Sequence, residues 1–340
     1  MHARRTHHDV KIIRQALNTA FFKDHAVNDQ LQRFMFDKAP VRGEFVSLQQ
    51  TWQDVLARRD YPAPIRTMLG EMMAAAALLS ANLKFDGALV IQIYGDGPVR
   101  MLVVQCNSDL TMRATAKLST ETEIIPDDAT FADLVNVSGA GRCAITLDPH
   151  DKQPGQQTYQ GVVPLTDENG DPIATIAEVL EHYMQHSEQL DTRLWLAANG
   201  EQAVGMLLQK LPSHGGHVTP GEVDADAWDR VCALGGTIKP AEMLSVDGDT
   251  LLHRLFWEET LQGAAPSPTR FACTCSRDKV GGMLSMLGRE EVEGILAEKG
   301  EVEVHCEFCN QRYAFDAIDA AQLFIEAGAA NVVPASERQH

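Results

Sequence analysis

The chain has 340 residues, 44% of them hydrophobic, and a formal net charge of -18 at pH 7. This length suits one large domain with a smaller one, and this composition is sufficient to bury a core. The strong negative charge would repel nucleic-acid phosphates, so it argues against a nucleic-acid partner.

Residues 1–26 form a polar N-terminal lead. It begins Met1-His-Ala-Arg-Arg-Thr-His-His and contains no apolar run of the kind that secretory signals carry. The most apolar stretch of the chain, 72–79, is far shorter than a membrane span. We therefore expect a cytoplasmic protein without membrane contact.

Residues 27–213 have the pattern of a single α+β core domain. A run of Met, Ala and Leu that is apolar nearly all round predicts a buried helix over 65–83, and an amphipathic helix is expected over 176–187. Gly95-Asp-Gly-Pro98 between two apolar runs is typical of a hairpin turn. No Lys-Ser or Lys-Thr follows these glycines, so they do not indicate phosphate binding. Apolar runs predict strands at 31–36, 41–46, 89–94, 99–104, 143–147, 158–163 and 192–196.

Residues 214–270 are predicted to be an acidic helical linker. Between Gly221 and Gln262 there are nine acidic residues and three basic ones. Short helical patterns occur, as at Leu251, Leu252, Leu255 and Phe256, but their apolar faces are narrow and glycine or proline interrupts them. Such a segment is stable only when it is docked on the core, so we expect a metastable linker.

Two tight cysteine pairs follow, Cys273-Thr-Cys275 and Cys306-Glu-Phe-Cys309, separated by 30 residues. Two short-range pairs are how a small domain usually supplies four sulfur ligands to zinc. The spacing predicts one zinc per chain in a module over 271–328, with 329–340 as a tail. His305 is expected in the strand before the turn, because four thiolates already complete the coordination shell.

We predict no catalytic residues. Four cysteines close the coordination shell, whereas hydrolytic zinc needs an open position, and the Cys-x-x-Cys pair lies between two predicted strands rather than in a thioredoxin-like βα turn. Asp148, His150 and His182 offer no nucleophile–base pair that the sequence can place. The isolated cysteines are expected to be packing residues: Cys106, Cys143 and Cys232.

With these motifs the chain resembles the redox-regulated 33 kDa heat-shock chaperone family of bacteria, over about Val27 to Ala327. The most specific element is the pattern C-x-C, about thirty residues, C-x-x-C. The chain departs from the family in its polar lead, in an insert around 166–172 and in an enlarged linker after Pro212. Further family-like stretches are Val41-Arg-Gly-Glu44, Gly95-Asp-Gly-Pro-Val99, Tyr159-Gln-Gly-Val162 and Ser187-Glu-Gln-Leu-Asp-Thr-Arg193.

The resemblance implies an ATP-independent holding chaperone that is inactive while reduced and zinc-bound. Oxidation would release zinc and close local disulfides, Cys273 with Cys275 and Cys306 with Cys309. The linker would then open and expose apolar surface for unfolding client proteins under oxidative and heat stress. The resemblance also implies a homodimer when oxidised, with client binding and dimerisation in the core domain. The alternative is a constitutive zinc-ribbon module for a protein or nucleic-acid partner.

Overall fold

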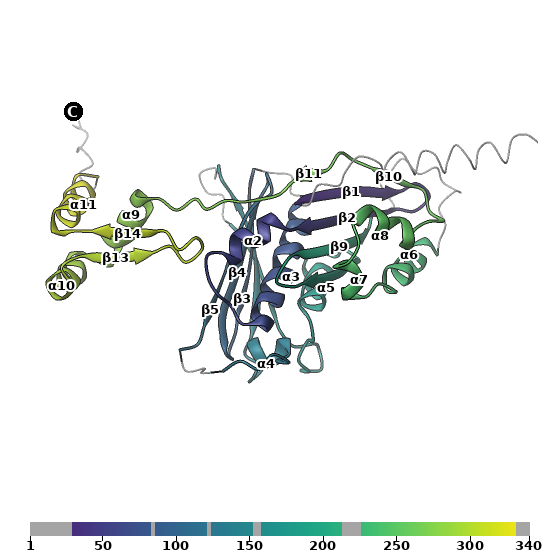
Figure 1. Cartoon of the computed structure of the whole chain (residues 1–340), viewed down its shortest axis with the longest axis horizontal. Helices are drawn as coiled ribbons and strands as arrows, with labels where there is room; N and C mark the ends of the chain where they lie inside the picture. Colours follow the sequence, from purple (N-terminus) through teal and green to yellow (C-terminus); the bar gives the residue numbers. More distant parts are fainter. Residues whose placement is uncertain (1–28, 83–85, 121–123, 152–157, 213–225, 331–340) are drawn as a thin grey trace, which may run out of the picture. The chain divides into compact units, whose positions relative to one another are not determined.

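The structure is a computed structural model that describes residues 29–82, 86–120, 124–151, 158–212 and 226–330 (Figure 1). The predicted polar lead 1–26, the beginning of the predicted linker at 213–225, and residues 331–340 lie outside the described residues. The fold is α+β, as predicted, and it divides into two compact units, Met1–Ala272 and Cys273–His340. None of the helices in the described ranges combines the length and the apolar character that a membrane crossing requires.

The first unit contains two six-stranded sheets. The first sheet has the order β10-β1-β2-β9-β8 with β11 also beside β1, and the second has the order β12-β5-β4-β3-β6-β7. Described strand pairs are antiparallel except β12 with β5, which is parallel. The strands of the core are β1 Gln30–Phe36, β2 Val41–Leu48, β3 Gly87–Tyr94, β4 Val99–Asn107, β5 Thr111–Leu118, β6 Arg142–Pro149, β7 Tyr159–Pro164, β8 Thr192–Ala198 and β9 Ala203–Lys210.

The predicted strands are all present, and β3 and β4 form the expected hairpin around Gly95. β5 and β9 were not predicted. Three further helices border the sheets: α2 Gln50–Leu56, α4 Phe131–Val135 and α5 Ile176–Ser187.

Helix α3, Ala63–Ser80, lies between the two sheets and contacts strands of both (Figure 1). It is the predicted buried helix, and Pro64 occupies its first turn, where a missing N–H costs no hydrogen bond. Gly70 permits a close approach to β8, because a Cβ atom there would lie 2.5 Å from the Cβ of Ala198. The main apolar cluster surrounds this helix and includes Cys106 and Cys143, so these two cysteines are packing residues.

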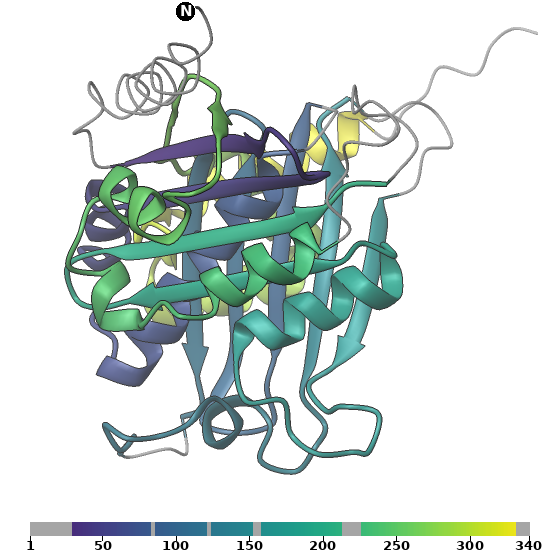
Figure 2. The ribbon, with the colours of Figure 1, turned by 90° about the vertical axis from the view of Figure 1, so that its right-hand side faces the viewer.

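The linker that follows contains short helices and very short strands. Figure 2 shows these helices lying across the face of the first sheet that points away from α3. The third isolated cysteine, Cys232, is only half-buried on the first of them. The elements are α6 Ala227–Gly235, α7 Pro240–Met243, α8 Gly248–Leu255, β10 Leu261–Gly263, β11 Ser267–Pro268 and β12 Arg270–Phe271.

A second apolar cluster joins the linker to that sheet. Phe256 is central to it, because its ring lies 5.1 Å from the ring of Phe36, edge to face, and 6.4 Å from the ring of Phe34. The narrow apolar faces of the linker are thus buried in a cluster that they share with the core. Other members are Val231, Met243, Leu251 and Leu252 from the linker, and Phe45, Met206 and Leu208 from the sheet.

The second unit is small. Its core has five buried apolar residues, Leu284, Val292, Val302, Phe315 and Ala320. A core of this size is too small to stabilise a domain without a further crosslink. Its elements are α9 Arg277–Leu287, α10 Arg289–Lys299, β13 Val302–His305, β14 Arg312–Phe315 and α11 Ala317–Ala330.

Candidate metal centre

The second cysteine pair occupies the turn of the β13–β14 hairpin. The Cys306 N–H donates to the carbonyl of Gln311 at 3.0 Å, and the Asn310 N–H donates to the carbonyl of Cys306 at 2.9 Å. Asn310 has a φ of 58°, in the left-handed region that asparagine tolerates better than most residues. The tight turn brings Cys306 and Cys309 onto one centre.

The first pair lies directly before α9. Ser276 caps this helix, because its hydroxyl accepts the N–H of Lys279 at 3.2 Å. The Lys279 ammonium in turn donates to the carbonyl of Thr274 at 2.7 Å. These two bonds hold the segment that carries Cys273 and Cys275 against the first turn of α9.

The four sulfurs meet at one point, with every Sγ within 4.8 Å of the others. The Sγ atoms of Cys273 and Cys306 are 3.7 Å apart, and those of Cys275 and Cys309 are 3.3 Å apart. In a tetrahedral zinc site with Zn–S bonds of about 2.3 Å, sulfurs are separated by about 3.8 Å. None of the four cysteines is in a disulfide, so the donor set and its spacing fit zinc.

Electrostatics at the centre also favour a cation. Burial raises the pKa of Cys306 above its ordinary value and raises that of Cys309 to about 12. Thiols gathered this closely lose their protons together only when a positive charge compensates them, and zinc does this for coordinating thiols.

Tyr313 is a member of the site that the sequence did not reveal. Its hydroxyl donates to the Sγ of Cys275 at 3.1 Å, and this hydrogen bond raises the pKa of Tyr313 to about 12. Tyr313 pairs with Val304 across the hairpin. Its position four residues after Cys309, on the strand leaving the turn, is the signal that could have identified it.

Arg277 supports the centre from α9. Its guanidinium donates to the carbonyl of Ala314 at 2.7 Å, lies 2.7 Å from the carboxylate of Asp319, and stacks 4.2 Å from the centroid of the Phe315 ring. One side chain therefore connects α9, β14 and α11. No pattern in the sequence indicates this role.

His305 is not a ligand in this arrangement. It lies at the end of β13, is exposed, and pairs with Glu303 at 3.5 Å. Within the part of the chain that the structure describes, the four cysteines are the single group of three or more potential metal ligands that converge.

The other residues considered as catalytic candidates have ordinary surroundings. Asp148 lies in β6, His150 pairs with Asp86 at 3.3 Å near the end of that strand, and the ring of His182 stacks on that of His186 on α5. These contacts do not form a nucleophile–base pair.

Comparisons with known proteins agree with this architecture. The family model described as Hsp33 protein matches residues 29–316. Proteins called 33 kDa chaperonin are 48% identical to the chain in Methylobacillus flagellatus, over 88% of this chain and 95% of that protein, and 48% identical in Chromobacterium violaceum, over 87% and 94%.

A solved structure shares the fold. The crystal structure of the 33 kDa chaperonin (heat shock protein 33 homolog) from Thermotoga maritima superimposes with a TM-score of 0.69, at 21% identity, over 89% of this chain and all of that one. From the family match and the relatives at 48% identity, we conclude that the chain belongs to the Hsp33 family of chaperones.

Proposed function

We propose that this protein is a redox-regulated, ATP-independent holding chaperone of the cytoplasm, inactive while reduced and zinc-bound and activated by oxidation. The observation that carries the proposal is the four-sulfur centre in a unit with a very small core, two residues after a linker that is docked on the core domain. Its partners would be unfolding client proteins and, when oxidised, a second copy of the chain. We expect neither a nucleic-acid partner nor a catalytic activity.

In the reduced state Cys273, Cys275, Cys306 and Cys309 would hold one zinc per chain. Bound zinc would keep the sulfurs as thiolates and contribute on the order of 10 kcal/mol or more to the folding of the module. The five buried residues of the module do not supply this much stability by themselves.

Oxidation would change the bonding of the sulfurs. Each disulfide forms one S–S bond from two thiolates and passes two electrons to the oxidant, and peroxide is thereby reduced to two molecules of water after taking up protons. Every sulfur pair that closes removes two of the four ligands, which leads to release of the metal.

We propose local pairing, Cys273 with Cys275 and Cys306 with Cys309. All four sulfurs surround one centre, so sulfurs of different pairs are also close: those of Cys273 and Cys306 are 3.7 Å apart, and those of Cys275 and Cys309 are 3.3 Å apart. Cross-pairing, however, requires the two halves of the module to stay packed while the metal leaves. Residues two or three apart remain neighbours even when the module unfolds, so local closure should prevail.

Opening of the linker would follow from this change. Its helices are held by the cluster around Phe256, and its last strand, β12, ends two residues before Cys273. When the module unfolds, this end of the linker is released, and the cluster is exposed on both the linker and the sheet. Exposed apolar surface of this kind binds unfolding proteins.

A paired aggregation assay tests the switch. Oxidised, zinc-free protein should suppress light scattering by a thermally unfolding client without ATP, whereas the reduced, zinc-loaded protein should not. Reduction and zinc reloading of the oxidised sample provide the control and should abolish the suppression. If both forms suppress light scattering equally, the protein is a chaperone without a redox switch.

Peptide mapping of the oxidised protein tests the pairing. Mass spectrometry should find Cys273 linked to Cys275 and Cys306 linked to Cys309 as the dominant products. A dominant peptide that links Cys275 to Cys309, or any of the four to Cys232, would contradict local closure.

A further inference from the structure

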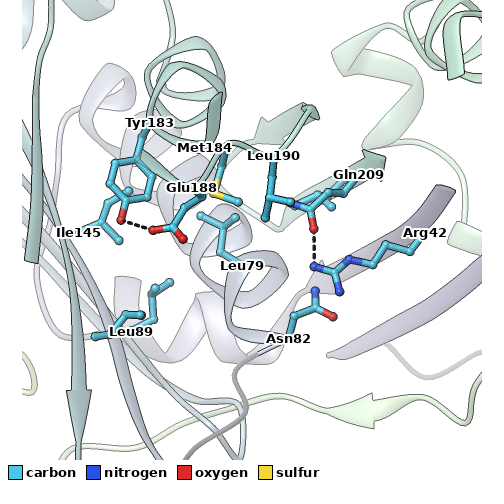
Figure 3. A pocket seen from close by; sticks show the side chains of 12 residues that line it. Arg42, Leu79, Asn82, Leu89, Ile145, Tyr183, Met184, Glu188, Leu190 and Gln209 are labelled. Carbon is cyan, nitrogen blue, oxygen red and sulfur yellow. Dashed lines mark hydrogen bonds between the residues drawn. The ribbon is translucent and has the colours of Figure 1, made fainter. Parts of the chain in front are cut away.

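A cavity of about 180 Å³ that opens to solvent lies in the core domain (Figure 3). Strands of both sheets and helices α3 and α5 line it. Seven aliphatic or thioether side chains form most of its wall: Leu79, Leu89, Ile145, Leu147, Met184, Leu190 and Leu207. Neither the proposed redox switch nor the docking of the linker uses this cavity.

One end of the cavity carries a positioned cation, Arg42 on β2. The Arg42 guanidinium donates through Nη2 to the Oε1 of Gln209, and the amide of Gln209 is itself oriented by donating to the Thr192 hydroxyl at 2.8 Å. Figure 3 shows the guanidinium beside Gln209 and Asn82 at this end of the cavity. The Nε atom of Arg42 is buried and makes no hydrogen bond.

The neighbouring carboxyl group compensates this cation only weakly. Glu44 lies 3.9 Å from Arg42 Nε, and its Oε1 accepts a hydrogen bond from Asn82 while its Oε2 is buried without one. Burial raises the pKa of Glu44, which disfavours its charged form. The charge of Arg33 also acts on this carboxyl, so one buried acid faces two guanidinium groups.

The opposite rim of the cavity carries a carboxylate, Glu188, that already has hydrogen-bond donors. Glu188 accepts hydrogen bonds from the hydroxyl of Tyr183 at 3.0 Å and from that of Tyr159 at 3.4 Å. A ligand with one negative group would therefore place that group at the Arg42 end and its apolar body along the wall.

We propose that this cavity binds a small carboxylate with an apolar body. The Arg42 guanidinium would receive the carboxylate, since charged hydrogen bonds of this type are strong and specific. A dry apolar cavity of about 150 Å³ accommodates a molecule of benzene size, so the present volume suits a body of about six to eight carbons.

Calorimetric titration of the reduced, zinc-loaded full chain with straight-chain carboxylates tests the site. From butanoate to octanoate, each added methylene should raise the affinity about fourfold, and the gain should stop once the cavity is full. Octanoate should bind about tenfold or more tightly than 1-octanol, because only the acid pairs with Arg42. Octylamine, which carries the opposite charge, should bind more weakly than either.

Two variants address the two ends of the cavity. Arg42→Gln should lower the affinity for octanoate about tenfold or more and leave that for octanol unchanged. Leu79→Phe should fill the apolar part and reduce the affinity for both ligands, and it keeps the test valid if Arg42→Gln is unstable. The matched control is Arg113→Gln, because Arg113 on β5 also donates to a glutamine, Gln105, but lies outside the cavity.

The titration tests the cavity independently of the proposed redox switch, because it uses reduced protein and no client protein. The proposal is contradicted if octanoate fails to bind at millimolar concentration. It is also contradicted if Arg42→Gln and Leu79→Phe both bind octanoate like the wild type, or if octylamine binds more tightly than octanoate.

Discussion

The double variant Cys306→Ser, Cys309→Ser is expected to bind no zinc in its reduced form and to lose the fold of its C-terminal module. Two of four ligands are removed, and the five-residue core of the module cannot replace a contribution on the order of 10 kcal/mol. Metal analysis should find about one zinc per chain in the wild type and none in the variant. Hydrogen exchange should become fast in α9, α10 and the β13–β14 hairpin while β3 and β4 stay protected.

The control for this experiment is Cys232→Ser. Cys232 is a half-buried cysteine on α6, outside the four-sulfur centre, so its replacement should leave the zinc content unchanged. If the double variant retains zinc at the wild-type level, or if its module stays protected from hydrogen exchange, the assignment of the four cysteines as the zinc site is wrong. If it unfolds but gains no ability to suppress aggregation while reduced, the centre is structural and the proposed switch fails.

The second large effect is expected from Phe256→Ala in the linker. Phe256 is 2% exposed and packs against Phe34 and Phe36, so its truncation should weaken the docking of the linker by about 3 to 5 kcal/mol. The population of open linker should then rise by about two to four orders of magnitude while the zinc centre stays loaded. Hydrogen exchange across 227–263 reports this opening, and the reduced variant should suppress aggregation.

The neighbouring residue supplies the control. Trp257 is 65% exposed, so Trp257→Ala removes a larger aromatic ring without removing a buried contact. It should leave exchange in the linker unchanged. Equal exchange in the wild type and Phe256→Ala would show that the linker is held independently of the phenylalanine cluster.

Much of the fold was accessible from hydrophobic patterns, and the two missed strands show where these patterns fail. β9 is buried on both faces: Leu207 packs in the cluster around α3, whereas Met206 and Leu208 pack beneath the linker. It therefore lacks the alternation of a half-buried strand. In β5 the inward positions include Ala114 and Ala116, whose small side chains give a weak apolar signal.

The four cysteines that converge on one centre could be picked out because their identity and spacing are local properties of the chain. The residues that support the centre could not be predicted from the sequence. Tyr313 reaches Cys275, and Arg277 reaches Asp319 and Phe315, only after the hairpin and the helices have packed. Arg277 has no distinguishing pattern in sequence, since arginine is common on solvated surfaces. For Tyr313 the sequence signal is only its place on the strand that leaves the cysteine turn.

The short strands of the linker pair with an edge strand of each sheet in the core domain. β10 pairs with Phe34–Phe36 and β11 pairs with Gln30 and Leu31, while β12 pairs with β5 at Thr111 and Met112. If the linker opens as proposed, the edges of both sheets would lose these partners, and their backbone N–H and C=O groups would become free. An unpaired sheet edge is a template for another extended chain. The opened protein would thus offer directional hydrogen bonds to any extended segment, regardless of its side chains.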